Sequence, residues 1–139
     1  MSADAFIDTN VVVYLLGSDT AKADRAEALI KPGANVSVQV LNEVANVLRR
    51  KQAMTWAEVR EVLGLLRGLC RVHPMTVETH AKGLDLGERY SLSVYDSMIL
   101  AAALLAGCDT LWSEDMQDGL LIDHQLRIRN PFDQQLEAA

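Results

Sequence analysis

The stretch "AFIDTNVVVYLL" (residues 5–16) constrains the fold most strongly, because it places one carboxylate, Asp8, among apolar side chains. A buried charge is costly unless it is paired or bound. Residues 4–8 predict a short buried strand that ends at Asp8. The valines that follow favour a strand, whereas the Asp-Thr-Asn tripeptide before them favours the start of a helix. The stretch alone leaves Asp8 as either a helix cap or a ligand.

Length and charge limit the classes of protein that the chain can belong to. Its 139 residues favour one domain, residues 1–139, and half of them are hydrophobic, which is enough for a core. The net charge is −6, with 19 acidic against 13 basic residues, whereas a non-specific nucleic-acid binder is usually basic. A nucleic-acid substrate would therefore need bound cations or local basic patches.

The chain shows no targeting or membrane signal. No run reaches about 18 apolar residues, so no membrane span is expected, and the N-terminus lacks the basic and apolar regions of a secretory signal. Cys70 and Cys108 stand alone, without the spacing of a CxxC motif, and are expected to be buried and reduced. These features predict a cytoplasmic protein.

Short apolar segments alternate with amphipathic ones along the chain. We expect strands at residues 4–8, 35–38, 70–75, 109–115 and 126–132, and helices at residues 20–31, 39–50, 55–69, 76–90 and 93–106. This alternation predicts an α/β fold with a parallel sheet covered on both faces. In such sheets ligands bind outside the carboxyl ends of the strands.

Four carboxylates lie at element ends or on otherwise apolar helices: Asp8, Glu43, Asp96 and Asp115. Asp8 and Asp115 end the first and fourth predicted strands. Glu43 and Asp96 lie near the starts of two apolar helices. Because carboxyl ends of parallel strands share one edge of a sheet, we expect the four carboxylates to approach one another there.

A divalent cation would relieve the repulsion within such a cluster. Mg²⁺ and Mn²⁺ prefer hard oxygen ligands. A zinc site would favour His or Cys, yet His73, His80 and His124 lack ligand spacing. A carboxylate-held Mg²⁺ suits phosphodiester hydrolysis, since it lowers the pKa of a water molecule and stabilises transition-state charge.

Each acid also has a purely structural interpretation. Asp8 can cap a helix, and Glu43 can be an exposed helix residue. Asp96 can favour the positive end of a helix, and Asp115 can occupy a turn. The pattern alone therefore leaves the metal site open.

Other candidate RNA contacts have the same ambiguity. Arg49, Arg50 and Lys51 can bind phosphates, but they suit the carboxyl end of a helix better. Trp56 and Trp112 can stack on bases, although a core position is the stronger expectation for an aromatic side chain.

Four segments together resemble the PIN-domain ribonucleases, specifically the VapC toxins of bacterial toxin–antitoxin pairs. They are "FIDTNVVVYLL" (residues 6–16), "LNEV" (41–44), "YDSMILAAALLAGCDTLWSEDMQDG" (95–119) and "RIRNPF" (127–132), and the likeness runs from Asp8 to about Phe132. The resemblance implies a three-layer α/β/α sandwich with a mainly parallel sheet of four to five strands. It also implies a helix over residues 10–16, against their β propensity.

The resemblance extends to individual residues. It implies that one acidic site holding Mg²⁺ or Mn²⁺ is formed by Asp8, Glu43, Asp96 and Asp115. Ser113 matches a supporting hydroxyl beside the fourth acid, and Asn10 matches an amide that orders the cluster. Asp118 ranks second as a supporting residue near the metal.

The implied activity is metal-dependent endoribonuclease action on RNA. The implied partners are a cognate antitoxin, whose C-terminal tail covers the groove and blocks the site, and a second copy of the chain in a homodimer. No membrane partner is implied.

Three rival functions fit the sequence less well. A receiver domain would need paired acids after the first strand and a late lysine, yet no lysine follows Lys82. A haloacid-dehalogenase-like phosphatase would need an Asp-x-Asp motif, where this chain has Asp8-Thr9-Asn10. A non-catalytic RNA- or protein-binding module on the same fold remains the alternative, although the presence of all four acids argues against it.

Overall fold

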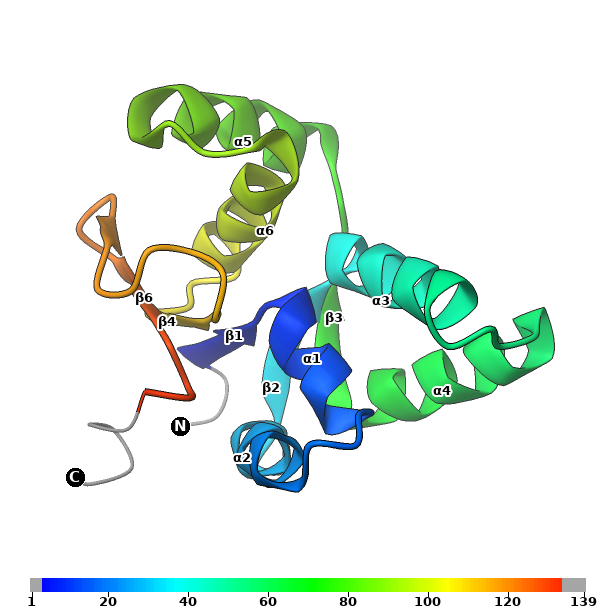
Figure 1. Ribbon diagram of the computed structural model, residues 1–139. Coiled ribbons are helices and arrows are strands. Elements are labelled where there is room, and N and C mark those ends of the chain that lie inside the picture. The colour runs from blue at the N-terminus through cyan, green and yellow to red at the C-terminus, as the bar shows by residue number, and fades with distance from the viewer. Residues whose placement is uncertain (1–3, 134–139) are drawn as a thin grey trace.

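The computed structural model describes residues 4–133, in which helices and strands alternate as predicted (Figure 1). The strands are β1 (Ala5–Ile7), β2 (Ala34–Ser37), β3 (Cys70–His73), β4 (Thr110–Trp112), β5 (Leu121–Ile122) and β6 (Leu126–Arg129). The helices are α1 (Thr9–Leu15), α2 (Thr20–Ile30), α3 (Val38–Arg50), α4 (Trp56–Leu69), α5 (Val77–Tyr90) and α6 (Val94–Leu105). The predicted single domain over residues 1–139 stays a prediction, and residues 1–3 and 134–139 lie outside the described part.

The strands form one sheet in the order β3-β2-β1-β4-β6-β5. All neighbours are parallel except β5 and β6, so the predicted α/β fold with a mainly parallel sheet is confirmed. The sheet has six strands, one more than the four to five expected. The additional strand, β5, has two residues and joins β6 through Asp123 and His124, which have φ of 49° and 56°. A two-residue strand is too short to produce an alternating pattern in the sequence.

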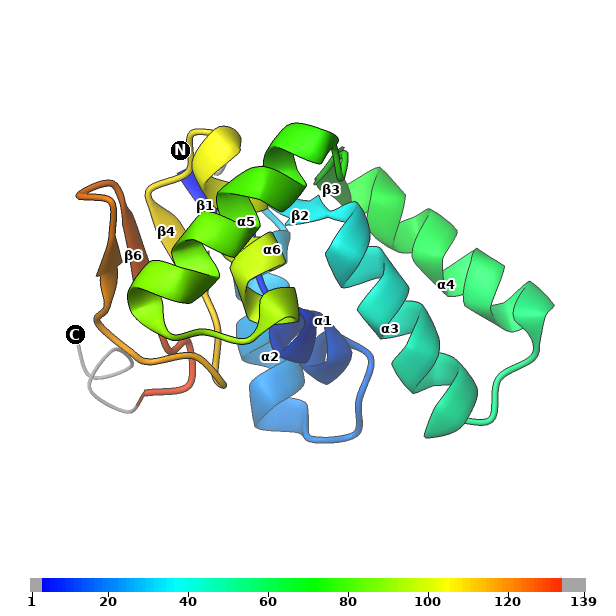
Figure 2. The same cartoon turned by 90° about the horizontal axis from the view of Figure 1, so that it is seen from above.

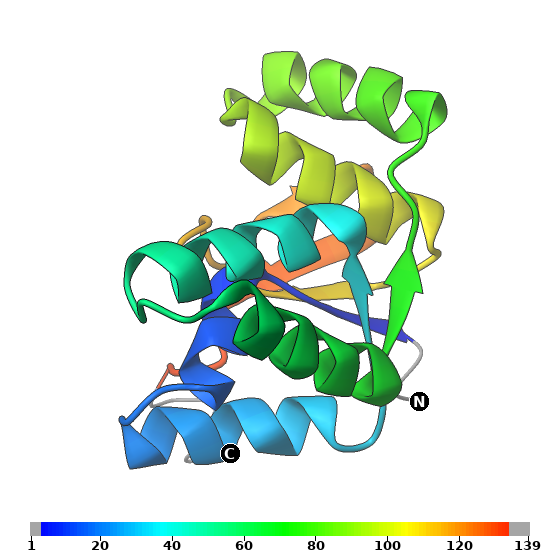
Figure 3. The ribbon, with the colours of Figure 1, turned by 90° about the vertical axis from the view of Figure 1, so that its right-hand side faces the viewer.

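The helices pack on both faces of the sheet. Helices α5 and α6 lie over one face and α2 lies over the other, whereas α3 and α4 flank β2 and β3 (Figures 1, 2 and 3). Helix α6 carries the largest set of buried residues among the helices, running from Ser97 to Leu104. This helix is apolar nearly all round, as expected of one buried between layers.

Helix α1 resolves the ambiguity after β1. Asp8 is its N-cap, with φ −77° and ψ 161°, and the helix begins at Thr9. Val11 and Val12 are fully buried. Burial of these two side chains and the cap at Asp8 therefore outweigh the β propensity of the valines.

The two cysteines lie in the interior of the fold. Cys70 and Cys108 are both buried, as predicted. Burial raises the pKa of both thiols to about 11, so they stay protonated at neutral pH. No helix within residues 4–133 is long and apolar enough to span a membrane.

Two helical glycines differ in their surroundings and give a test of the packing between α5 and α6. A Cβ at Gly64 of α4 would meet nothing within 4 Å, whereas one at Gly83 of α5 would lie 2.6 Å from the Met98 sulfur. Gly64→Ala should stabilise the protein by about 0.5–1 kcal/mol, through helix propensity alone. Gly83→Ala should destabilise it by about 1 kcal/mol, because the clash outweighs that gain.

Urea unfolding of both variants measures the two changes in free energy. Equal stabilisation by the two substitutions would show that the Met98 side chain moves aside freely and that α5 and α6 are not closely packed at Gly83.

Candidate active site

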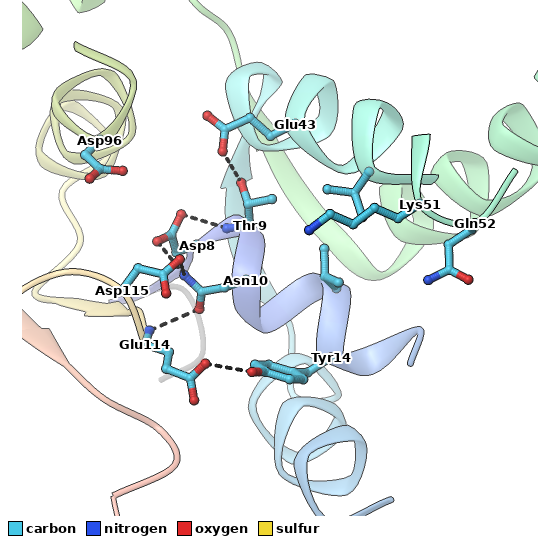
Figure 4. A pocket seen from close by; sticks show the side chains of 12 residues that line it. Asp8, Thr9, Asn10, Tyr14, Glu43, Lys51, Gln52, Asp96, Glu114 and Asp115 are labelled. Atoms are coloured by element: carbon cyan, nitrogen blue, oxygen red, sulfur yellow. Dashed lines mark hydrogen bonds between the residues drawn. The ribbon is translucent and has the colours of Figure 1, made fainter. Parts of the chain in front are cut away.

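A pocket of about 410 Å³ lies beyond the carboxyl ends of β1 and β4 (Figure 4). Its lining includes all four predicted acids, which come from four separate segments: Asp8, Glu43, Asp96 and Asp115. Their carboxylates point toward a shared space (Figure 4). The structure therefore brings together side chains that lie up to 107 positions apart in the sequence, between Asp8 and Asp115.

Asp8 is the most buried of the four, at 4% exposure. One carboxylate oxygen accepts a hydrogen bond from the Thr9 backbone N–H at 2.7 Å. The other accepts from Ser113 Oγ at 2.7 Å and from Asn10 Nδ2 at 2.9 Å. All three donors are neutral, so within residues 4–133 the charge of Asp8 is hydrogen-bonded but not neutralised by a cation.

The four carboxylates affect one another's protonation. Burial raises the pKa of Asp8 to about 6, hydrogen bonds from Ser113 and Thr9 oppose the rise, and the charges of Asp96 and Glu43 add to it. The pKa of Asp96 is also raised, mainly by burial and further by Glu43 and Asp115, against a hydrogen bond to Ser93. The cluster is therefore under electrostatic strain that a cation would relieve.

Glu43 has polar partners on both carboxylate oxygens. Thr9 Oγ1 donates to Oε1 at 2.8 Å, and Gln39 Nε2 donates to Oε2 at 2.8 Å. Thr9 thus links Glu43 to the Asp8 cap through its side chain and backbone. From the sequence, Thr9 is expected only at the start of a helix. Its position next to Asp8 is the one sequence signal that it lies near the site.

Asn10 and Ser113 lie where the predicted supporting residues should lie. Asn10 Nδ2 is within hydrogen-bond distance of both Asp8 and Asp115, the latter at 3.2 Å. Asn10 Oδ1 accepts from the Glu114 backbone N–H at 3.0 Å. Ser113 is buried, donates to Asp8, and accepts from the backbone N–H of Asp115 at 3.3 Å. These two side chains join β1 to the loop after β4.

Asp118 is not brought into the pocket. It lies on the loop after β4 and accepts a hydrogen bond from the Asn130 backbone N–H at 2.9 Å. This contact ties the loop to the end of β6. The structure therefore does not support the predicted position of Asp118 near a metal.

A fifth carboxylate of the pocket, Glu114, was missed by sequence analysis. Its two oxygens accept hydrogen bonds from Tyr14 Oη at 2.7 Å and from Lys22 Nζ at 2.8 Å. Burial alone would raise the pKa of Glu114, but Lys22 and Tyr14 together lower it below its usual value. Glu114 is thus paired with a cation from α2, unlike the four predicted acids. No local motif joins residues 22 and 114.

The basic residues at the carboxyl end of α3 have two different roles. Arg49 donates to the Met54 carbonyl at 2.8 Å and lies 4.3 Å from the centre of the Trp56 ring, so it holds the turn between α3 and α4. Lys51, in contrast, lines the acidic pocket (Figure 4). Trp56 is 60% exposed, and the half-buried Trp112 packs beside two arginines.

The donor set fits a hard divalent cation. It consists of carboxylate oxygens, with no His or Cys among the pocket-lining residues described. As the side chains lie, no three His, Cys, Asp or Glu residues of the range 4–133 are close enough to hold one ion. To hold one ion, these side chains would therefore have to rotate toward one another. Glu43 would then exchange its hydrogen bonds with Thr9 and Gln39 for a contact with the ion.

A model of the PIN domain family matches residues 5–117 of the chain. None of the curated protein sequences matches significantly. Solved structures also share the fold, among them the three described below. A toxin–antitoxin complex from Klebsiella pneumoniae aligns with a TM-score of 0.71 at 19% identity, over 93% of this chain and 98% of that one.

The other two similar structures have related descriptions. Mycobacterium tuberculosis VapC20, described as a sarcin–ricin loop cleaving toxin, aligns with a TM-score of 0.66 at 20% identity, over 80% of this chain and 91% of that one. VapBC2 from Rickettsia felis, bound to a DNA fragment from its promoter, aligns with a TM-score of 0.64 at 16% identity, over 91% of this chain and 97% of that one. These likenesses support the three-layer arrangement expected from the sequence.

The raised pKa of Asp8 predicts how the free energy of unfolding depends on pH when EDTA keeps the protein free of cations. Between the ordinary pKa of 3.8 and the raised value of about 6, the folded state holds a proton that the unfolded state has lost. The contribution of Asp8 to stability is therefore largest at low pH and is lost as pH rises through 6. Asp8→Asn should gain stability relative to wild type by about 1.4 kcal/mol more at about pH 7.5 than at about pH 5.

Chemical denaturation of both proteins at the two pH values measures this difference. Hydrogen bonds lost in the variant cancel in the comparison, as does the titration of groups outside the pocket, such as His73. If the difference in unfolding free energy between Asp8→Asn and wild type does not change with pH, Asp8 ionises normally in the folded protein.

Proposed function

This chain belongs to the PIN domain family, and we propose that it is a metal-dependent endoribonuclease that acts as the toxin of a toxin–antitoxin pair. The four-carboxylate pocket carries the proposal, because it supplies the ligands that phosphodiester hydrolysis requires. The fold it shares with VapC20, a toxin described as cleaving the sarcin–ricin loop, supports RNA as the substrate class.

The proposed division of roles follows the family resemblance and the shared pocket. Asp8, Asp96 and Asp115 would hold Mg²⁺ or Mn²⁺, and Glu43 would complete the cluster and orient the attacking water. A cation held there would lower the pKa of water and offset the charge that builds on the scissile phosphate. Hydrolysis forms one new P–O bond to the water oxygen, breaks the bond to the leaving oxygen, and transfers a proton to that oxygen.

Asn10 and Ser113 act as positioning residues. Both donate to Asp8 and both contact the segment that carries Asp115, so they set the separation of the two acids. Glu114 has a different role. Its pairing with Lys22 and Tyr14 anchors the loop after β4 to α1 and α2 and leaves it unsuited to binding a cation.

The proposed partners come from the structural relatives and from the resemblance. Two of the similar structures are toxin–antitoxin assemblies, which supports an antitoxin partner for this chain. Homodimerisation is implied by the resemblance and stays a prediction.

The direct test is cleavage of a structured RNA by purified protein that is free of antitoxin. We expect cleavage with Mg²⁺ or Mn²⁺ and none with EDTA. Asp96→Asn should lower the rate at least about 100-fold, because it removes a proposed ligand of the cation that would offset the charge developing on the phosphate.

Asp24→Asn is the matched control, since Asp24 is exposed on α2 and should leave the rate unchanged. Equal cleavage in EDTA would contradict the metal requirement. Absence of cleavage under all conditions, with RNA still bound, would favour the non-catalytic RNA-binding alternative.

Lys51 gives the acidic pocket one cation that can meet the substrate. Its side chain is exposed, lines the pocket, and forms no hydrogen bond or ion pair within residues 4–133. Lys22, by comparison, is already paired with Glu114. We therefore assign Lys51 a contact with an RNA phosphate.

Lys51→Ala should weaken RNA binding and reduce the slope of log K against log salt concentration by about 0.7, the value for one phosphate contact on a single strand. Fluorescence anisotropy with labelled RNA measures both quantities. Lys31→Ala is the control, because Lys31 is exposed at the end of α2, beside a different pocket. An unchanged slope in Lys51→Ala would remove Lys51 from the interface.

A further inference from the structure

A second cleft adjoins the acidic pocket. It has a volume of about 600 Å³ and shares Glu43 and Asp96 with the first pocket. The rest of its lining includes three amide side chains of α3 and one aromatic side chain of α6: Gln39, Asn42, Asn46 and Tyr95. A strand whose phosphate lies among the four carboxylates can therefore reach this cleft.

Two of the three amide side chains in the cleft are free to bind a ligand. Asn42 and Asn46 are exposed and lie four residues apart, on one face of α3. Neither forms a side-chain hydrogen bond within the described range 4–133, whereas Gln39 is engaged with Glu43. Each free amide offers a donor and an acceptor side by side, the arrangement that pairs with the edge of a nucleobase.

Tyr95 supplies a stacking surface. Its side chain is 66% exposed and forms no hydrogen bond in the part of the chain that the structure describes. Tyr95 directly precedes Asp96 in α6. Its neighbour Val94 is also exposed, at 56%. Unpaired RNA bases stack on exposed aromatic rings, and such stacking is insensitive to base identity.

The charge of the cleft argues for a base over a phosphate. No described lining residue is cationic, and Glu43 and Asp96 are already assigned to the cation of the first pocket, so this cleft offers a phosphate no positive partner of its own. The cation available to the strand, Lys51, lines the other pocket. A neutral, flat group with hydrogen-bonding edges is the ligand that these side chains suit.

We propose that this cleft binds an unpaired nucleobase next to the scissile phosphate, with Tyr95 stacked on the base and Asn42 and Asn46 bound to its edge. The inference rests on the proposed ribonuclease function and adds the form of its substrate. The base must be unpaired, because a paired base presents neither a free face nor its Watson–Crick edge. Base preference at one position beside the cut would therefore be set by α3.

Binding of a short labelled single-stranded RNA of mixed sequence tests the cleft without cleavage, in the full-length Asp8→Asn protein. Tyr95→Ala should weaken binding roughly tenfold, as expected for loss of one stacked base. Tyr95→Phe should stay within about twofold, because the ring is kept. Val77→Ala, an exposed side chain on α5, should have no effect.

Cleavage of RNAs that differ at each position near the cut supplies the second measurement, in a protein that retains all four acids. Asn42→Ala and Asn46→Ala should weaken the base preference at one position, because they slow cleavage of the most preferred RNA more than cleavage of the least preferred one. A merely structural role would instead slow cleavage of all sequences equally.

The outcomes separate the two proposals. If wild type cleaves RNA while Tyr95→Ala keeps its affinity and the asparagine variants keep their base preference, the cleft proposal is wrong and the ribonuclease proposal stands. If Tyr95→Ala changes only the sedimentation behaviour of the protein, this surface is an interface between copies of the chain. If wild type neither binds nor cleaves RNA, both proposals fail.

Discussion

The repulsion among four carboxylates in one pocket is the constraint on which the site depends. Asp8 is buried with three neutral donors, and the charges of Asp96 and Glu43 raise its pKa further. A folded protein normally avoids such an arrangement or neutralises it. Here the cation from α2 neutralises Glu114 instead. We propose that the four remaining charges are ligands for a cation.

The parallel sheet is what makes this arrangement possible. Strand β4 lies beside β1, and the Asp8 backbone N–H donates to the Trp112 carbonyl at 3.0 Å. Asp8 and Ser113 therefore meet at the carboxyl ends of adjacent strands. Helix α6 adds Asp96 in its first turn, where the helix dipole favours negative charge, and α3 adds Glu43 from its second turn. The same helices place Asn42 and Tyr95 beside the acids, so that chemistry and proposed base recognition share one edge of the molecule.

The sequence predicted the features that follow from local patterns. Strands ending at Asp8 and near Asp115, the helix expected at residues 55–69 and the apolar helix α6 all have clear signals, and the structure agrees with them. The helix after Asp8 had conflicting signals, which burial of its valines decided. Contacts between distant segments left no pattern to find. The pairing of Lys22 with Glu114 and the cleft that holds Tyr95 depend on tertiary packing, and β5 is too short for periodicity.

The measurement that tests the account most directly is Mn²⁺ binding by isothermal titration calorimetry. It compares wild type with variants in which one carboxylate of the pocket is replaced by its amide. Replacing any of the four unneutralised acids, Asp8, Glu43, Asp96 or Asp115, should weaken binding at least about tenfold. Glu114→Gln should stay within about twofold of wild type, because its charge is already paired with Lys22. The account would be contradicted if Glu114→Gln weakened binding as much as the other four variants, or if none of the five did.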